Sequence, residues 1–208
     1  MNYLKYCLLI VILFVSCDSG KRPLVGETDY QRELNATFKD ASKSPLKPKD
    51  LKNFTGLDFY PFDSAYIVKA KFTPTENARL FQMPTTTDRK PYYKEYGKLQ
   101  FRLQGKELEL TVYQSQEDLK HPVYKDLLFL PFTDNTSGNG SYGGGRYMDI
   151  YTTDQLPDGS FVLNFNNTYN PYCVYNDTFS CPITPRKNHL EIEVKAGIKD
   201  FTSLYAKD

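Results

Sequence analysis

The chain has 208 residues, with 26 Lys and Arg against 25 Asp and Glu and an apolar share of 40%. This length suits one ordinary domain, with room for a helical appendage. The balanced charge predicts no nucleic-acid partner, because binding DNA or RNA requires a basic face. A disordered chain is excluded by the 14 Phe and 17 Tyr, which supply ample bulk to bury.

Residues 1–16 have the pattern of a secretory signal peptide. Lys5 supplies the positive start, and residues 8–15 (LLIVILFV) form an apolar run that is too short to span a bilayer. The motif VSC that ends at Cys17 resembles the bacterial lipoprotein signal, in which a lipid is attached to the cysteine. An ordinary signal peptide with an incidental Cys17 is the alternative. The resemblance implies a protein of the bacterial cell envelope, anchored to the membrane through Cys17 and facing the periplasm or the cell surface.

The remaining chain divides into three parts. Residues 17–26 are polar and are interrupted by Gly and Pro, which predicts a tether. Residues 27–55 form an N-terminal helical segment, and residues 56–208 form a β domain.

A helix is predicted near residue 28, because Thr28 and Gln31 have the spacing of a capping box. Ser44-Pro45 ends this helix. A second short helix is predicted over residues 48–53, with Pro48 in its first turn. The first helix carries one apolar stripe, formed by Tyr30, Leu34, Phe38 and Ala41.

After Gly56 the hydrophobic pattern alternates with a period of two residues. Residues 99–112 predict a β-hairpin that turns at Gln104-Gly105. The continuous apolar run at residues 127–130 predicts a strand that is buried on both faces. Further strands are predicted at residues 57–60, 65–72, 79–82, 146–151, 161–165 and 190–194.

Strands and helices do not alternate, so a parallel α/β sheet is excluded. We predict a mainly β (α+β) fold, an antiparallel β sandwich or rolled barrel with an N-terminal helix. Two long segments without periodicity, residues 133–145 and 166–188, interrupt the strands. Irregular segments of this length inside a domain often carry function.

These two segments resemble the bacterial family known as domain of unknown function 1684. The matching blocks are residues 131–150, 164–188 and 193–197, with the motifs TSG, YGGGRY, YNPYC and CP in this order. Asn164 and Ile198 stand where the family pattern usually has acidic residues. The resemblance implies a shared fold and a shared pocket, and it implies no activity.

Residues 138–143 fit the pattern GxGxxG, which also occurs in dinucleotide-binding loops. That function requires a helix after the third glycine, whereas a glycine-rich turn and a strand follow here. We therefore expect no cofactor. Two interpretations stay open: a flexible hairpin loop, or a loop whose backbone N–H groups bind an anion together with Arg146.

Cys173 and Cys181 are separated by seven residues in the second irregular segment. Outside the cytoplasm such a pair favours a disulfide, with a reduced pair as the alternative. A zinc site would need two more ligands, and only His121 and His189 are available as imidazoles, so we expect no metal.

We predict a lipid-anchored envelope protein with a polar, aromatic-lined site for a small anionic or sugar-like ligand. Arg146 is the expected charge anchor at the wall of the pocket, in contact with the 166–188 segment. Its expected acceptor is Asp134 or a carbonyl of Tyr169 or Asn170. An envelope hydrolase that uses an acid near Arg146, and a structural partner-binding module, are the alternatives. The predicted ligand-binding residues are Asp134, Thr136, Ser137, Tyr142, Arg146, Asn166, Tyr169 and Asn170.

Overall fold

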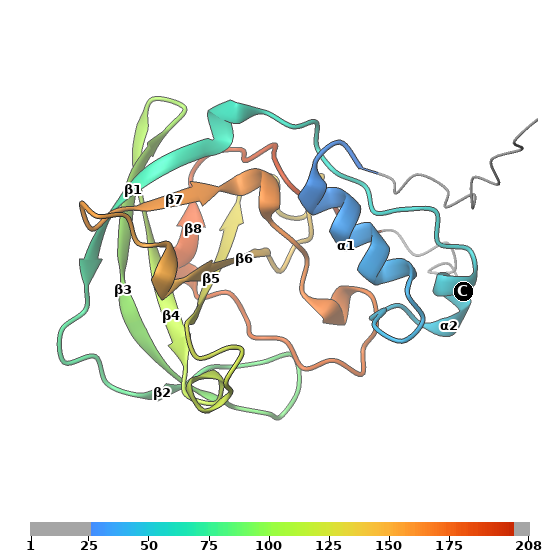
Figure 1. Cartoon of the computed structure of the whole chain (residues 1–208), viewed down its shortest axis with the longest axis horizontal. Helices are drawn as coiled ribbons and strands as arrows, with labels where there is room; N and C mark the ends of the chain where they lie inside the picture. Colours follow the sequence, from blue (N-terminus) through green and yellow to red (C-terminus); the bar gives the residue numbers. More distant parts are fainter. Residues whose placement is uncertain (1–25, 202–208) are drawn as a thin grey trace, which may run out of the picture.

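The computed structural model describes residues 26–201 and shows one antiparallel sheet that rolls into a nearly closed barrel (Figure 1). The strand order is β6-β5-β4-β3-β1-β7, with β2 paired to β3 and β8 to β5. This confirms the mainly β fold and selects the rolled barrel over the sandwich. The strands are β1 (Ile67–Pro74), β2 (Phe81–Gln82), β3 (Tyr92–Leu103), β4 (Lys106–Ser115), β5 (Leu127–Asp134), β6 (Arg146–Tyr151), β7 (Phe161–Asn164) and β8 (His189–Leu190).

Helices make up a small part of the described chain. The α-helices are α1 (Asp29–Lys39) and α2 (Pro48–Lys52), and short 3-10 turns occur at Ser64–Tyr66, Asp118–Lys120, Thr152–Asp154, Phe165–Asn167, Tyr172–Val174 and Arg186–Asn188. No helix of the described part is long and apolar enough to cross a membrane. The predicted signal peptide and Cys17 lie outside the described residues, as does most of the predicted tether.

Helix α1 begins as predicted and ends earlier. Thr28 caps it by accepting a hydrogen bond from the backbone N–H of Gln31 at 3.2 Å. The helix ends at Lys39, because Asp40 adopts an extended conformation and its carboxylate accepts from the N–H of Ser42. Ala41 is therefore exposed and is not part of the apolar stripe, contrary to the prediction.

The predicted hairpin is formed by β3 and β4, with Phe101 opposite Leu108. Gln104 and Gly105 both have positive φ angles, 51° and 77°, as a two-residue hairpin turn requires. The prediction for residues 127–130 was wrong in one respect. Strand β5 is not buried on both faces, because Leu127 and Phe129 are only half-buried while Leu128 and Leu130 fill the barrel.

The C-terminal strand was also predicted only in part. Leu190, Ile192 and Val194 are buried and alternate with exposed residues, as expected. Only β8 joins the sheet, however, and it pairs parallel to β5. Residues 191–198 form no further ladder, so their backbone groups need other partners.

The barrel closes through an irregular contact between its two edges. Tyr169, which follows β7, exchanges two backbone hydrogen bonds with Tyr147 of β6, at 2.9 and 3.0 Å. The main core fills the barrel and includes Leu99, Leu110, Val112, Leu128, Leu130, Phe132, Leu163, Phe165 and Val194. Helix α1 lies outside the barrel, next to the orange segment that follows β7 (Figure 1).

Candidate functional site

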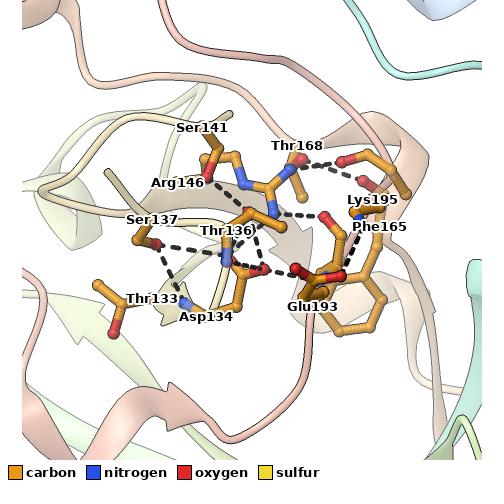
Figure 2. A network of polar contacts seen from close by, with 12 residues as sticks. Thr133, Asp134, Thr136, Ser137, Ser141, Arg146, Phe165, Thr168, Glu193 and Lys195 are labelled. Carbon is orange, nitrogen blue, oxygen red and sulfur yellow. Dashed lines mark hydrogen bonds and ion pairs between the residues drawn. The ribbon is translucent and has the colours of Figure 1, made fainter. Parts of the chain in front are cut away.

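Arg146, the first residue of β6, points into the interior and is completely buried. Its guanidinium donates to the carbonyl oxygen of Val194 at 2.8 Å and of Ile198 at 3.3 Å, and it also donates to the carbonyl of Ala196. Figure 2 shows Arg146 between Thr136 on one side and Lys195 on the other. It forms an ion pair with Asp134 at 3.2 Å. Arg146 therefore supplies the hydrogen bonds that the C-terminal segment lacks from the sheet.

The Asp134 carboxylate has partners on both oxygens. Oδ2 accepts from the backbone N–H of Val194 at 2.7 Å and from the hydroxyl of Thr136 at 2.8 Å. Oδ1 accepts from Arg146 and, at 3.3 Å, from the hydroxyl of Ser137. Burial lowers the pKa of Arg146, and the charge of Asp134 opposes this effect. Nε of Arg146 has no hydrogen-bond partner, whereas the other polar atoms of the pair are engaged. The pair is thus a dehydrated network that holds residues 194–198 in place.

Four of the predicted ligand-binding residues (Asp134, Thr136, Ser137 and Arg146) therefore meet, but they meet inside the protein. Asp134 is the partner of Arg146, as predicted. Instead of the alternative acceptors Tyr169 and Asn170, the guanidinium uses the carbonyls of Val194, Ala196 and Ile198. The prediction that Arg146 lines a pocket was wrong, since the side chain is fully buried and lines none of the four main cavities of the described residues. Because all contacts of Arg146 lie in the core, its guanidinium does not bind an anion at the glycine-rich loop, which one interpretation of that loop required.

Two more predicted residues also line none of these four cavities. Asn166 is buried, and its amide exchanges hydrogen bonds with the backbone of Asp63, at 2.9 and 3.1 Å. Tyr142 is half-buried, and its ring packs against Gly144. The Asn166 contact joins two segments that are far apart in the sequence, whereas the Tyr142 contact lies within the glycine-rich loop.

The two remaining predicted residues, Tyr169 and Asn170, line a cavity of about 460 Å³ on the outer side of the barrel wall. We call this space the aromatic cavity. Its volume lies in the range of small-molecule sites, about 300–1,000 Å³. It is lined by Tyr30, Leu34, Phe38, Tyr93, Phe129, Tyr147, Asp149, Tyr169, Asn170, Pro171, Tyr172, Phe179, Ser180, Cys181 and Pro182.

Strand β6 separates the two sites by its alternation. Arg146, Met148 and Ile150 are buried in the barrel, so Tyr147 and Asp149 face outward. Helix α1 and the segment after β7 cover this outward face and leave the cavity between them.

Aromatic rings in mutual contact build the cavity wall. The ring of Tyr147 meets the rings of Phe129 and Tyr169 edge to face, with centroids 4.6 and 5.9 Å apart. Tyr93 joins Phe129 at 5.9 Å. The hydroxyl of Tyr147 donates to the carbonyl of Pro182, which fixes the ring. The rings on the sheet side of the cavity are therefore packed against one another.

Asp149 is the acidic residue of the cavity. Its Oδ1 accepts a hydrogen bond of 2.6 Å from the hydroxyl of Tyr169. The side chain is exposed in the open cavity, and the protein atoms packed around it raise the pKa of Asp149 by partial desolvation. Burial also raises the pKa of the Tyr169 and Tyr30 hydroxyls, so both stay protonated. Tyr169 donates to Asp149, and the Tyr30 hydroxyl is available as a donor.

Sequence reasoning missed Asp149 and Tyr30 as site residues. The signal for Asp149 was present in the alternation of β6, which places it on the same face as Tyr147. The signal for Tyr30 was absent, because the apolar stripe of α1 does not indicate whether the helix covers a core or a cavity.

Cys173 and Cys181 lie side by side at one end of the aromatic cavity, where Cys181 is part of the wall. Both are free thiols in the structure, and the backbone N–H of Cys173 donates to Sγ of Cys181 at 3.1 Å. The hydrogen bond from Cys181 lowers the pKa of the Cys173 thiol to about 7. The predicted disulfide is therefore not formed here and stays a prediction. The described residues contain no cluster of metal ligands.

The fold and the two sites define a small antiparallel β-barrel with a helix-covered cavity on its wall. Residues 52–199 match the family model described as "Protein of unknown function (DUF1684)", so the chain belongs to this family, as the resemblance implied. The chain is also similar to the solution NMR structure of an uncharacterized protein from Haloarcula marismortui. The two are 35% identical, the match covers 84% of this chain and 91% of that chain, and the TM-score is 0.63. No curated protein matches.

Proposed function

We propose that the chain binds a small organic molecule in the aromatic cavity. The observation that carries this proposal is the combination of an apolar ring-lined space with a few converging polar groups, the carboxylate of Asp149 and the hydroxyls of Tyr30 and Tyr169. Rings supply contact area and polar groups fix orientation, which is the usual composition of a small-molecule site.

Tryptophan reporters test this proposal. The chain contains no Trp, so Leu34→Trp places a single fluorophore on the cavity wall. Glu33→Trp is the matched control, because Glu33 is the neighbouring residue on the exposed face of α1. We expect members of a set of aromatic alcohols, amines, acids and monosaccharides to change the emission of the Leu34→Trp variant with saturation and to leave that of the Glu33→Trp variant unchanged. If no compound distinguishes the two variants, the proposal is wrong.

The alternative of an envelope hydrolase has weaker support. The acid nearest to Arg146 is Asp134, and both of its oxygens are engaged by Arg146, Thr136 and Val194. A general acid or base needs a free lone pair or proton within reach of a substrate. Asp134 has neither free lone pairs nor exposure.

We also propose that a lipid on Cys17 attaches the protein to the envelope membrane. The support is the apolar run at residues 8–15 followed directly by the VSC motif. Cys17→Ser should move the protein from the detergent phase to the aqueous phase in detergent partitioning, because the acyl chains are lost. Cys7→Ser is the control, and it should partition as the unaltered protein does. Equal partitioning of the Cys17 variant would contradict the anchor.

A further inference from the structure

The carboxylate of Asp149 has no cationic partner among the residues that the structure describes. The ionisable groups that act on it are the hydroxyls of Tyr30, Tyr151, Tyr169 and Tyr172, all neutral, and the carboxylate of Asp118. Tyr169 provides a single hydrogen bond at 2.6 Å. The carboxylate is exposed in the cavity and has one neutral donor from the protein, so a cation placed beside it forms a charge pair that no described residue supplies.

The rings around this carboxylate favour the same sign of charge. An aromatic face carries negative electrostatic potential, so it attracts a cation within about 6 Å of the ring centre. Tyr147 and Tyr169 lie edge to face, and hence present differently oriented surfaces to one space. Among the described residues that line the cavity, none is Lys, Arg or His. An anion would therefore meet a negative wall with no counter-charge.

We propose that the aromatic cavity selects a small organic cation, an ammonium group held between the tyrosine rings and the carboxylate of Asp149. This inference rests on the proposed function and specifies its ligand class. The ammonium lies against Asp149, and the apolar body of the ligand packs on the rings of Phe129 and Tyr147. The cation replaces the anion in the initial expectation, because the one basic residue expected at the site, Arg146, is in the barrel core.

Three probes of similar shape and different charge test the ligand class: 2-phenylethylamine, 2-phenylethanol and phenylacetate. Binding to the full chain is measured by isothermal titration calorimetry at pH 7. We expect the amine to bind about tenfold more tightly than the alcohol, the effect of one partly screened charge pair with ring contacts. Phenylacetate should bind more weakly than the alcohol.

Asp149→Asn is the diagnostic variant, because Asn keeps an oxygen that accepts from Tyr169 and removes the charge. We expect this variant to bind amine and alcohol with affinities within about threefold of each other, since only the ring contacts remain. Asp177→Asn is the matched control. Asp177 lies in the same irregular segment as Tyr169, is exposed, and its loss changes the net charge equally. This control should keep the tenfold preference.

The outcomes separate the ligand class from the proposed function. If the alcohol binds the unaltered protein and the Asp149→Asn variant as tightly as the amine does, the cation inference is wrong and the small-molecule function stands. The same holds if phenylacetate binds most tightly, or if Asp149→Asn keeps the preference for the amine. If none of the three probes binds the unaltered protein, the cation inference is wrong, and the proposed function fails with it only if no compound of the wider set changes the emission of the Leu34→Trp variant. Binding of the alcohol to the variant also shows that the variant is folded.

Discussion

Asp134 and Asp149 lie on the neighbouring strands β5 and β6 and face opposite sides of the barrel wall. Asp134 is buried in the barrel with a guanidinium, two hydroxyls and two backbone N–H groups as partners. Asp149 faces the aromatic cavity with one tyrosine hydroxyl. The difference shows how the same side chain can serve structure or binding. A carboxylate whose lone pairs are all engaged stabilises the fold, whereas one with unused lone pairs and raised pKa is available to a ligand.

The largest effect should come from breaking the Arg146–Asp134 pair. Arg146→Ala leaves the Asp134 carboxylate and three backbone carbonyls without their donor, so we expect a loss of about 3–5 kcal/mol in the free energy of unfolding. Urea unfolding followed by circular dichroism measures this loss. Lys69→Ala is the control, because it breaks an exposed ion pair with Asp158 and should cost less than about 1 kcal/mol. Similar losses in the two variants would show that Arg146 does not lock the fold.

A slightly smaller effect is expected where the C-terminal segment enters this network. Gly197 has φ +72°, and a Cβ there would lie 2.0 Å from Oγ1 of Thr168. Gly197→Ala should lower the free energy of unfolding by about 3 kcal/mol, through backbone strain and overpacking. Gly105→Ala isolates the clash, because Gly105 has φ +77° and open space around it. This control should lose only about 1 kcal/mol.

Next in size is the thiol pair at the end of the aromatic cavity. The predicted Cys173–Cys181 disulfide would close a short loop and should add about 2.5 kcal/mol in the chain-entropy model. Mass spectrometry of non-reduced peptides from protein exported to the periplasm should find the two residues joined. A reductant should then lower the stability of the unaltered protein and leave a Cys173→Ser variant unchanged. Two free thiols in the exported protein would refute the disulfide.

The smallest effect on the free energy of unfolding is expected at Asp149, where a substitution should stabilise the fold. Its pKa is raised in the folded protein, so the folded state binds a proton more tightly than the unfolded chain does. The charge therefore destabilises the fold as pH rises above the ordinary Asp value of about 3.9 and through the raised pKa. Asp149→Asn removes this destabilisation. We expect a gain of at most about 1 kcal/mol at pH 7, because the open cavity screens the charge.

The pH dependence sharpens this last prediction. The gain from Asp149→Asn should disappear below about pH 4, where the carboxyl is protonated in both states. Thermal unfolding of the unaltered protein and the variant between pH 3 and pH 8 measures it. If the variant is less stable than the unaltered protein at pH 7, Asp149 has a stabilising partner. The contrast between a fully engaged Asp134 and an unpaired Asp149 would then be wrong.

Local patterns in the sequence were sufficient for much of the fold. The alternation of residues 99–112 and the Gln104-Gly105 turn predicted the β3–β4 hairpin, and the Thr28 cap predicted the start of α1. These features depend on residues within a few positions of one another. Burial of Leu190, Ile192 and Val194 was also predicted, because a period of two residues shows which face is apolar.

The partners of the buried polar groups depended on tertiary structure. Residues 190–194 look like a strand, yet the carbonyl of Val194 accepts from Arg146 and its N–H donates to Asp134. The sequence placed these two charges near each other and could not show whether they faced the core or solvent. Whether Arg146 lines a pocket depends on which face of β6 is covered by helix α1. This helix lies more than 100 residues away in the sequence, and no short-range pattern encodes its position on the sheet. The aromatic cavity with Asp149 exists only because α1 and the segment after β7 cover one face of that strand.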